Sequence, residues 1–256
     1  MYDAIFLDCD GVVTDKKARV DKRVLFEVYR LAHAGKNIAF ITGRSLTWLS
    51  HNIVPVIEHF NPSPEDKAKL FFIGEYGNRW LFFSGIGFMH GADNSNSLPV
   101  NVRAKIRNEI ARFPLLFFDE TKESFVSLEV RHDALISPSM EAEANRQLDI
   151  AAGYFSTRYP EFNVVRTLYA IDILPKGLDK ASGIKRALEL AGRVAEVLVL
   201  GDSQADLLMG EELMNQGVKF KFYYLGEQPV PPALFEVKKP SSRYAEGAHE
   251  VLSGIR

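Results

Sequence analysis

The sequence predicts an α/β protein built on a mainly parallel sheet flanked by helices, with a second α+β module inserted into it. Short apolar runs alternate with longer amphipathic segments along most of the 256 residues. The apolar runs are nearly continuous, which is typical of strands covered on both faces. A chain of this length also favours one large domain or two modest ones.

Five buried strands are expected in the parallel sheet, at 4–7, 37–41, 70–73, 197–200 and 220–225. Between the first two, the segment 21–34 repeats apolar residues at helical spacing. Gly35 follows this segment and is a typical helix stop. A strand, a helix and a second strand in this order predict a parallel pair joined by a helical crossover.

The middle of the chain follows a different pattern. A helical stripe ends near Phe113, and polar and apolar residues then alternate over 125–130, as in an antiparallel strand with one solvated face. A second helix is expected to begin at Ser137 and Pro138, followed by strands at 162–165 and 168–173. We therefore interpret 84–172 as an inserted α+β domain, and 1–83 together with 173–256 as the main domain.

Charge and composition exclude several classes of protein. The net charge of −2 gives no electrostatic reason to expect nucleic acid or an anionic membrane as a partner. Cys9 is the one cysteine of the sequence, so an internal disulfide is impossible. No apolar run reaches the roughly 20 residues that span a bilayer. We expect a cytoplasmic protein, monomeric or homodimeric, that has neither nucleic acid nor membrane as a partner.

Two aspartates directly follow the first expected strand. Asp8 and Asp10 stand two residues apart, and Gly11 after them lets the backbone turn sharply. Carboxylates at the end of a buried strand are costly unless a cation or phosphoryl group compensates them. One carboxylate as nucleophile and a second as general acid/base can attack a phosphate ester. The alternative is a turn with two solvated aspartates.

Two further segments carry groups that can hold a phosphate. Thr42 and Gly43 follow the strand at 37–41 and offer a hydroxyl and backbone N–H groups; the alternative is a simple helix cap. Lys180 is the first residue of an expected helix, where its positive charge is unfavourable beside the helix dipole and needs a compensating anion. The alternative for Lys180 is a solvated surface lysine.

A second pair of acids follows the strand at 197–200. Asp202 and Asp206 add two carboxylates, and hard oxygen ligands suit Mg²⁺; the alternative is a helix capped at Asp202. In open α/β sheets ligands bind at the carboxyl ends of the strands, so loops that are distant in sequence can converge there. The four polar segments together therefore predict one phosphate and magnesium site.

These segments resemble the motifs of the haloacid dehalogenase superfamily of phosphohydrolases. Asp8-Cys9-Asp10-Gly11 is similar to its first motif, Thr42 to its second, Lys180 to its third, and Gly201-Asp202 with Asp206 to its fourth. The resemblance covers 1–83 and 173–256. The insertion lies between the second and third motifs, where the C2-type caps of subclass IIB occur.

Two other segments narrow the resemblance within the superfamily. Residues 74–78 resemble the Glu-x-Gly turn of trehalose-phosphate phosphatases, and 171–180 resemble the matching segment of sucrose phosphatases and phosphomannomutases. The resemblance implies a Rossmann-like core with an inserted C2-type cap domain and the activity of a phosphoric monoester hydrolase that uses Mg²⁺.

The resemblance also implies a role for each motif residue. Asp8 would attack phosphorus and form an aspartyl-phosphate. Asp10 would protonate the leaving alcohol and then activate water, with its backbone carbonyl on the metal. Phosphate binding is implied for Thr42, Gly43 and Lys180, and metal binding for Asp8, Asp10, Asp202 and Asp206.

The substrate remains open at this point. A small phosphorylated metabolite, such as a sugar phosphate, is expected for a phosphatase. A phosphomutase of the phosphomannomutase type is the first alternative, and a non-catalytic metabolite sensor, which would be expected to lack at least one of the acids, is the second. Polar residues expected on the strands of the inserted domain either select the substrate or lie on a solvated surface: Lys122, Glu123, Glu129, Arg131 and His132.

Overall fold

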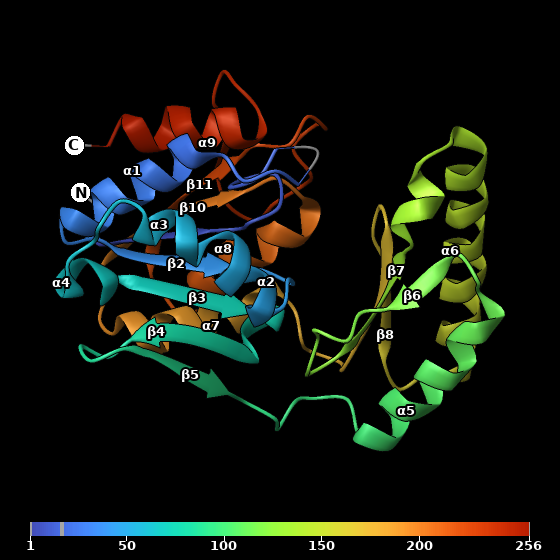
Figure 1. Cartoon of the computed structure of the whole chain (residues 1–256). Helices are drawn as coiled ribbons and strands as arrows, with labels where there is room; N and C mark the ends of the chain where they lie inside the picture. Colours follow the sequence, from blue (N-terminus) through green and yellow to red (C-terminus); the bar gives the residue numbers. More distant parts are fainter. Residues whose placement is uncertain (1, 16–17, 256) are drawn as a thin grey trace. The chain divides into compact units, whose positions relative to one another are not determined.

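The computed structural model describes residues 2–15 and 18–255 (Figure 1). Within these residues the strands form one eight-stranded and one four-stranded sheet. The chain divides into two compact units: unit 1 comprises Met1–Ala92 and Asp179–Arg256, and unit 2 comprises Asp93–Leu178. One mainly parallel and one antiparallel sheet confirm the predicted fold class.

The sheet of unit 1 has the strand order β12-β11-β10-β1-β2-β3-β4-β5. Six of its strands are parallel: β1 (Ala4–Leu7), β2 (Asn37–Ile41), β3 (Leu70–Gly74), β10 (Glu196–Gly201), β11 (Lys219–Tyr224) and β12 (Val237–Lys238). At one edge β4 (Arg79–Phe83) pairs antiparallel with β3, and β5 (Phe88–Ala92) pairs antiparallel with β4. The five strands expected from apolar runs are all in this sheet.

Helices cover both faces of the unit 1 sheet, as Figure 1 shows for α1 and α9 on one side and α7 on the other. One face carries α1 (Lys22–His33), α2 (Leu46–Asn52), α3 (Val54–Glu58) and α9 (Tyr244–Ser253). The other carries α7 (Lys180–Ala191) and α8 (Leu207–Asn215). The short α4 (Pro64–Lys67) packs beside α1.

The two cores explain the continuous apolar runs of the sequence. Ile5 and Leu7 belong to the core under α1 and α9, whereas Ala4 and Phe6 belong to the core under α7 and α8. Successive residues of a strand point to opposite faces. A strand buried on both faces therefore needs an apolar residue at every position, which is what β1 has.

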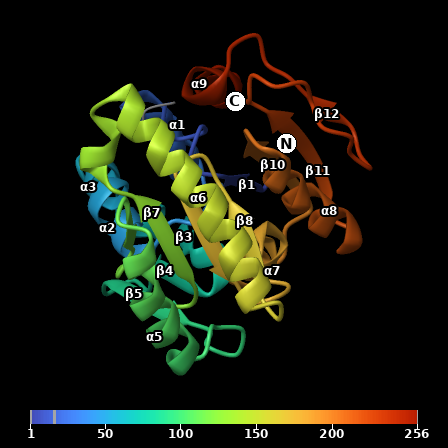
Figure 2. The same cartoon turned by 90° about the vertical axis from the view of Figure 1, so that its right-hand side faces the viewer.

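Unit 2 is an antiparallel sheet with the order β6-β7-β9-β8. Its strands are β6 (Leu116–Phe118), β7 (Val126–Val130), β8 (Asn163–Arg166) and β9 (Ala170–Leu174), and its helices are α5 (Val100–Glu109) and α6 (Pro138–Arg158). Helix α6 packs on all four strands, and Figure 2 shows it lying across them. Ser137 caps α6 by accepting a hydrogen bond from the Met140 N–H, as expected from the Ser-Pro pair.

The unit boundaries differ from those expected. Residues 88–92 form β5 and pair with β4, so they belong to unit 1 rather than to the insertion. The Phe88 ring packs edge-on against Phe72 in the unit 1 core. At the other end β9 runs to Leu174 in the unit 2 sheet. The boundaries expected at 84 and 172 therefore lie at 93 and 178.

Within residues 2–15 and 18–255, none of the helices has both the length and the apolar character needed to cross a membrane.

Candidate active site

The sheet order brings three of the polar segments side by side. Strands β10, β1 and β2 are neighbours, with Leu7 opposite Leu200 on one side and opposite Phe40 on the other. All three run in the same direction, so their carboxyl ends lie at one edge. The loops that carry Asp8, Thr42 and Asp202 therefore meet there.

Lys180 joins this edge from α7 and makes two ion pairs. Its Nζ lies 2.5 Å from Asp8 Oδ1 and 3.0 Å from Asp206 Oδ1, and it donates a hydrogen bond to the Ile41 carbonyl at 2.9 Å. All three charged side chains are buried. Burial by itself lowers the pKa of Lys180, but the carboxylates of Asp206 and Asp8, with a smaller contribution from Tyr76, hold it above its usual value. Lys180 is therefore a permanent positive charge.

Three carboxylates form a cluster around this lysine. Oxygen atoms of Asp8, Asp202 and Asp206 lie within 4.8 Å of one another. Burial raises the pKa of Asp8 well above its usual value, and burial together with the Asp206 charge raises the pKa of Asp202 to about 7. One lysine does not neutralise three acids, and this excess of negative charge fits a metal ion bound by oxygen ligands.

Asp206 has two separate functions in this cluster. Its Oδ2 accepts hydrogen bonds from the Asp202 N–H at 3.0 Å, the Ser203 N–H at 2.9 Å and the Ser203 hydroxyl at 2.7 Å. Its Oδ1 is buried and faces Lys180, without a hydrogen bond of good geometry. Asp206 therefore shapes the loop after β10 and holds Lys180 in place, while Asp202 remains partly accessible.

The turn after Asp10 fits tightly against the same loop. Gly11 has φ of +67°, a conformation that side chains with a Cβ rarely adopt, and a Cβ at this position would overlap the Asp202 carboxylate. Asp8 itself accepts a hydrogen bond from the Cys9 N–H at 2.7 Å through Oδ1. Glycine is therefore required for the two acid-bearing loops to approach each other.

Thr42 and Gly43 begin the loop between β2 and α2. The Thr42 side chain is buried, and its hydroxyl accepts a hydrogen bond from the Arg44 N–H at 3.1 Å. The Thr42 N–H donates to the Ile73 carbonyl at 3.0 Å, which fixes the loop to the end of β3. Thr42 and Gly43 thus lie at the same edge of the sheet as Asp8.

Asp10 is placed differently from the other three acids. Its carboxylate receives hydrogen bonds from Arg44 Nε at 3.0 Å and from Arg44 Nη2 at 2.9 Å, and it is about half exposed. The Arg44 guanidinium lies 5.1 Å from the centre of the Trp48 ring. The carboxylate of Asp10 is therefore outside the cluster of Asp8, Asp202 and Asp206. The resemblance assigns the backbone carbonyl of Asp10, and not its carboxylate, to the metal.

Neither a family model nor a curated protein matches this chain. Solved structures do match. A haloacid dehalogenase-like hydrolase from Bacteroides thetaiotaomicron superposes with a TM-score of 0.68 over 99% of both chains, at 18% identity. The C-terminal domain of a C. albicans trehalose-6-phosphate phosphatase gives a TM-score of 0.70 over 98% of this chain and 92% of that one, at 14% identity. An Aspergillus fumigatus trehalose-6-phosphate phosphatase gives 0.57 over 98% and 92%, at 16% identity.

The chain has the haloacid dehalogenase-like fold. The fold expected from the four motifs is thereby confirmed over nearly the whole chain, including unit 2.

The polar residues that the sequence suggested on unit 2 are not all on strands. Glu129 lies on β7, but Lys122 and Glu123 precede that strand, and Arg131 and His132 follow it. The expectation was wrong for these four, because they lie beyond the ends of the strand at 126–130. Arg131 begins a turn and hydrogen bonds to Asp133 at 2.8 and 3.1 Å. Its charge is therefore satisfied locally on the surface.

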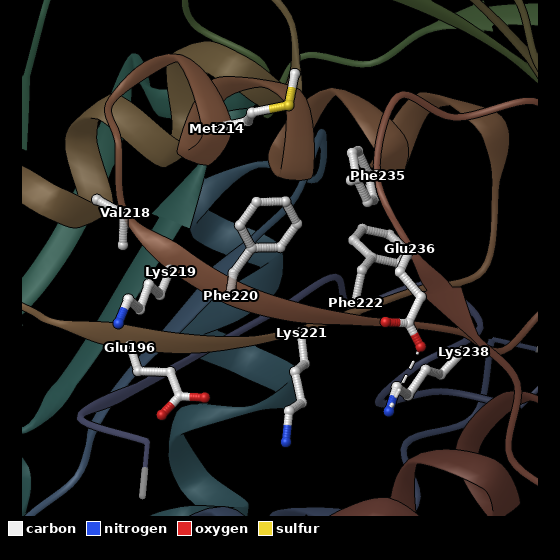
Figure 3. Close-up of a pocket in the computed structure, with 10 residues that line it drawn as sticks. All are labelled: Glu196, Met214, Val218, Lys219, Phe220, Lys221, Phe222, Phe235, Glu236 and Lys238. Carbon is white, nitrogen blue, oxygen red and sulfur yellow. Dashed lines mark ion pairs between the residues drawn. The ribbon is translucent and has the colours of Figure 1, made fainter.

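A hollow elsewhere in the haloacid dehalogenase-like core is shown in Figure 3. Phe220 and Phe222 of β11 and Phe235 line one side of it, and an ion pair joins Lys238 to Glu236. Its β11 residues are 219–222, at the amino-terminal half of that strand. Asp8, Thr42 and Asp202 instead follow the carboxyl ends of β1, β2 and β10, so this hollow is separate from the candidate site.

Two residues close to the site were given no role by the sequence. Arg44 holds Asp10, and Tyr76 lies against Gly43. The position of Arg44 directly after Thr42 and Gly43 was a usable signal, since guanidinium groups pair well with carboxylates. The position of Tyr76 depends on an unusual backbone conformation, for which the sequence carries no comparable signal.

Proposed function

We propose that this protein is a Mg²⁺-dependent phosphatase that hydrolyses a small phosphorylated metabolite, a sugar phosphate in particular. The observation that carries the proposal is the buried Asp8–Lys180 ion pair within a three-acid cluster at the carboxyl ends of β1 and β10. The similarity to trehalose-6-phosphate phosphatases supports a phosphorylated sugar as substrate.

Asp8 is the nucleophile in this proposal. In the described part of the chain its hydrogen bond and ion pair both fall on Oδ1, which leaves Oδ2 to attack phosphorus. The new bond joins Oδ2 to phosphorus as the bond between phosphorus and the leaving alcohol oxygen breaks. Burial raises the pKa of Asp8 well above its usual value, and the charge of Lys180 opposes part of this rise and so favours the ionised nucleophile.

Asp10 is the general acid and base. It gives its proton to the departing alcohol oxygen, and it then takes a proton from the water that attacks the aspartyl-phosphate. Its half-exposed position suits a group that must exchange protons with substrate and water. Arg44 holds both carboxylate oxygens before substrate binds, so substrate binding must replace at least one of these hydrogen bonds.

The phosphoryl group is held between Thr42, Gly43 and Lys180. The Thr42 hydroxyl and the Gly43 N–H can donate to phosphoryl oxygens, and Lys180 balances the charge that accumulates with the phosphoryl group beside Asp8. Asp8 and Asp202, with the backbone carbonyl of Asp10, would hold Mg²⁺, supported by Asp206. When bound, Mg²⁺ supplies positive charge that stabilises the phosphoryl oxygens during transfer.

Unit 2 acts as the substrate-selecting cap in this proposal. It is an independent α+β body inserted between the second and third motifs. Closure of such a domain over a reaction excludes water and completes the binding surface. The chemistry therefore resides in unit 1, and the choice of substrate in unit 2.

The proposal is tested by phosphate release from a panel of sugar phosphates and other phosphorylated metabolites, with Mg²⁺ or with EDTA. We expect Mg²⁺-dependent release by the natural sequence, and a loss on the order of 10⁴-fold or more in Asp8→Asn, because the nucleophile is gone. Asp133→Asn is the matched control on an exposed turn of unit 2 and should stay within about twofold of the natural sequence.

Failure of every substrate to release phosphate, or equal turnover by Asp8→Asn, would contradict the proposal. Conversion of one sugar phosphate into another without net phosphate release, dependent on a sugar 1,6-bisphosphate, would instead support a phosphomutase.

A further inference from the structure

The turn that follows β3 has an unusual backbone. Glu75 and Tyr76 have φ of 50° and 56°, so two consecutive residues with side chains are in the left-handed region. A non-glycine residue in this region is uncommon because its Cβ crowds the backbone, and consecutive ones are rarer still. Strained conformations of this kind persist where surrounding contacts hold them, and they concentrate at functional sites.

Backbone hydrogen bonds attach this turn to the loop between β2 and α2, residues 42–45, which we call the phosphate loop. The Tyr76 N–H donates to the Thr42 carbonyl at 3.0 Å, and the Glu75 N–H donates to the Arg44 carbonyl at 2.9 Å. On the other side a Cβ on Gly77 would lie 2.8 Å from the Ser182 carbonyl of α7. The turn is thus held between the phosphate loop and the helix that carries Lys180.

This conformation puts the Tyr76 ring over the phosphate loop. A Cβ on Gly43 would lie 2.6 Å from Tyr76 Oη and 2.7 Å from Cζ, so the phenol rests directly on the Gly43 backbone. The hydroxyl therefore lies beside Gly43, one of the three residues assigned to phosphate binding.

We propose that the Tyr76 hydroxyl donates a hydrogen bond to the phosphoryl group of the bound substrate. The assignment rests on the proposed phosphatase function and adds one donor to Thr42, Gly43 and Lys180. A hydrogen bond to a charged acceptor is stronger than one between neutral groups. The proposal also explains the strained turn, because this turn brings the Tyr76 side chain from the end of β3 across Gly43.

Tyr76→Phe tests the contact because it keeps the ring over Gly43 and removes only the hydroxyl. The probe is orthovanadate with Mg²⁺, a phosphate analogue whose binding is measured by titration and needs no turnover. We expect binding about tenfold weaker in Tyr76→Phe, and a loss of about tenfold in kcat/KM for p-nitrophenyl phosphate. Tyr29→Phe, a matched change on α1, should alter neither value, and the thermal unfolding of both variants should match the natural sequence.

Vanadate binding by Tyr76→Phe equal to that of the natural sequence would overturn the assignment. Unchanged vanadate binding with a loss only against sugar phosphates would also overturn it, because the hydroxyl would then contact the leaving sugar. If the natural sequence releases no phosphate from any substrate, the proposed function fails, and the vanadate titration still decides the contact of Tyr76 separately.

Discussion

The candidate site of unit 1 and the surface of unit 2 treat charged side chains in opposite ways. In unit 1, Lys180, Asp8 and Asp206 are at most 6% exposed, and they pair with one another. Three ion pairs of unit 2 lie instead at its surface: Arg131 with Asp133, Arg146 with Glu143, and Arg107 with Glu120. Two of these three pairs join residues that are two or three positions apart in the sequence.

The difference shows where each unit is sensitive to change. A buried charge that loses its partner keeps the full cost of leaving water, whereas an exposed one is solvated again. The three buried charges of the candidate site therefore depend on each other. The charges in the three surface pairs of unit 2 do not depend on their partners in this way.

Removal of Lys180 should have the largest effect on stability. Lys180→Met leaves Asp8 and Asp206 buried beside each other without a cation, so we expect a loss of about 3–5 kcal/mol in the free energy of unfolding of unit 1. Urea unfolding followed by tryptophan fluorescence measures this directly, because both tryptophans, Trp48 and Trp80, lie in unit 1. The second change Asp206→Asn should recover part of the loss.

Arg131→Met in unit 2 is the matched control for this comparison. Its partner Asp133 is more than half exposed, so neither the unfolding of the protein nor its turnover should change measurably. Equal urea midpoints for Lys180→Met and the natural sequence would contradict the contrast between the units.

The pH dependence of the metal-free protein gives a smaller effect. Burial and the Asp206 charge raise the pKa of Asp202 from 3.8 to about 7 in the folded protein. Between pH 4 and 7 the folded state therefore holds a proton that the unfolded chain has released. The free energy of unfolding should fall as pH rises through this window, by about 3 kcal/mol at most. With EDTA, unit 1 should resist urea better at pH 5 than at pH 8.

Mg²⁺ should reduce or reverse this dependence, because the cation competes with the proton at Asp202 and binds more tightly as pH rises. Asp202→Asn should show a weaker dependence in EDTA and none of the Mg²⁺ effect. The same dependence in Asp202→Asn and in the natural sequence would show that other groups titrate in this range.

The sequence predicted the centre of the unit 1 sheet better than its edge. Strands β1, β2 and β10 are apolar at nearly every position because both of their faces are covered. The edge strand β5 was missed because Gly85, Gly87 and Gly91 interrupt the pattern around it, and glycine in a strand resembles a loop. Helix α1 was predictable because its apolar stripe and its cap at Asp21 are both local signals.

Most of the candidate site could also be predicted. Asp8, Thr42 and Asp202 each follow an apolar strand, so the general rule for strand ends brought them together. The pairing of Arg44 with Asp10 could not be deduced, because it joins loops 34 residues apart whose geometry depends on tertiary structure. The position of Tyr76 could not be predicted for a similar reason. Its left-handed backbone conformation is held by tertiary contacts and not by the preference of tyrosine itself.

The central claim is that Asp8 and Asp10 have different roles, and trapping the intermediate tests it most directly. Asp10→Asn should still transfer the phosphoryl group of p-nitrophenyl phosphate, since this leaving group needs no proton, but should hydrolyse the intermediate slowly. After acid quench and digestion, mass spectrometry should find one phosphoryl group on Asp8, and none in the double variant with Asp8→Asn. A phosphoryl group on another residue, or none in Asp10→Asn while the natural sequence releases phosphate, would contradict the account.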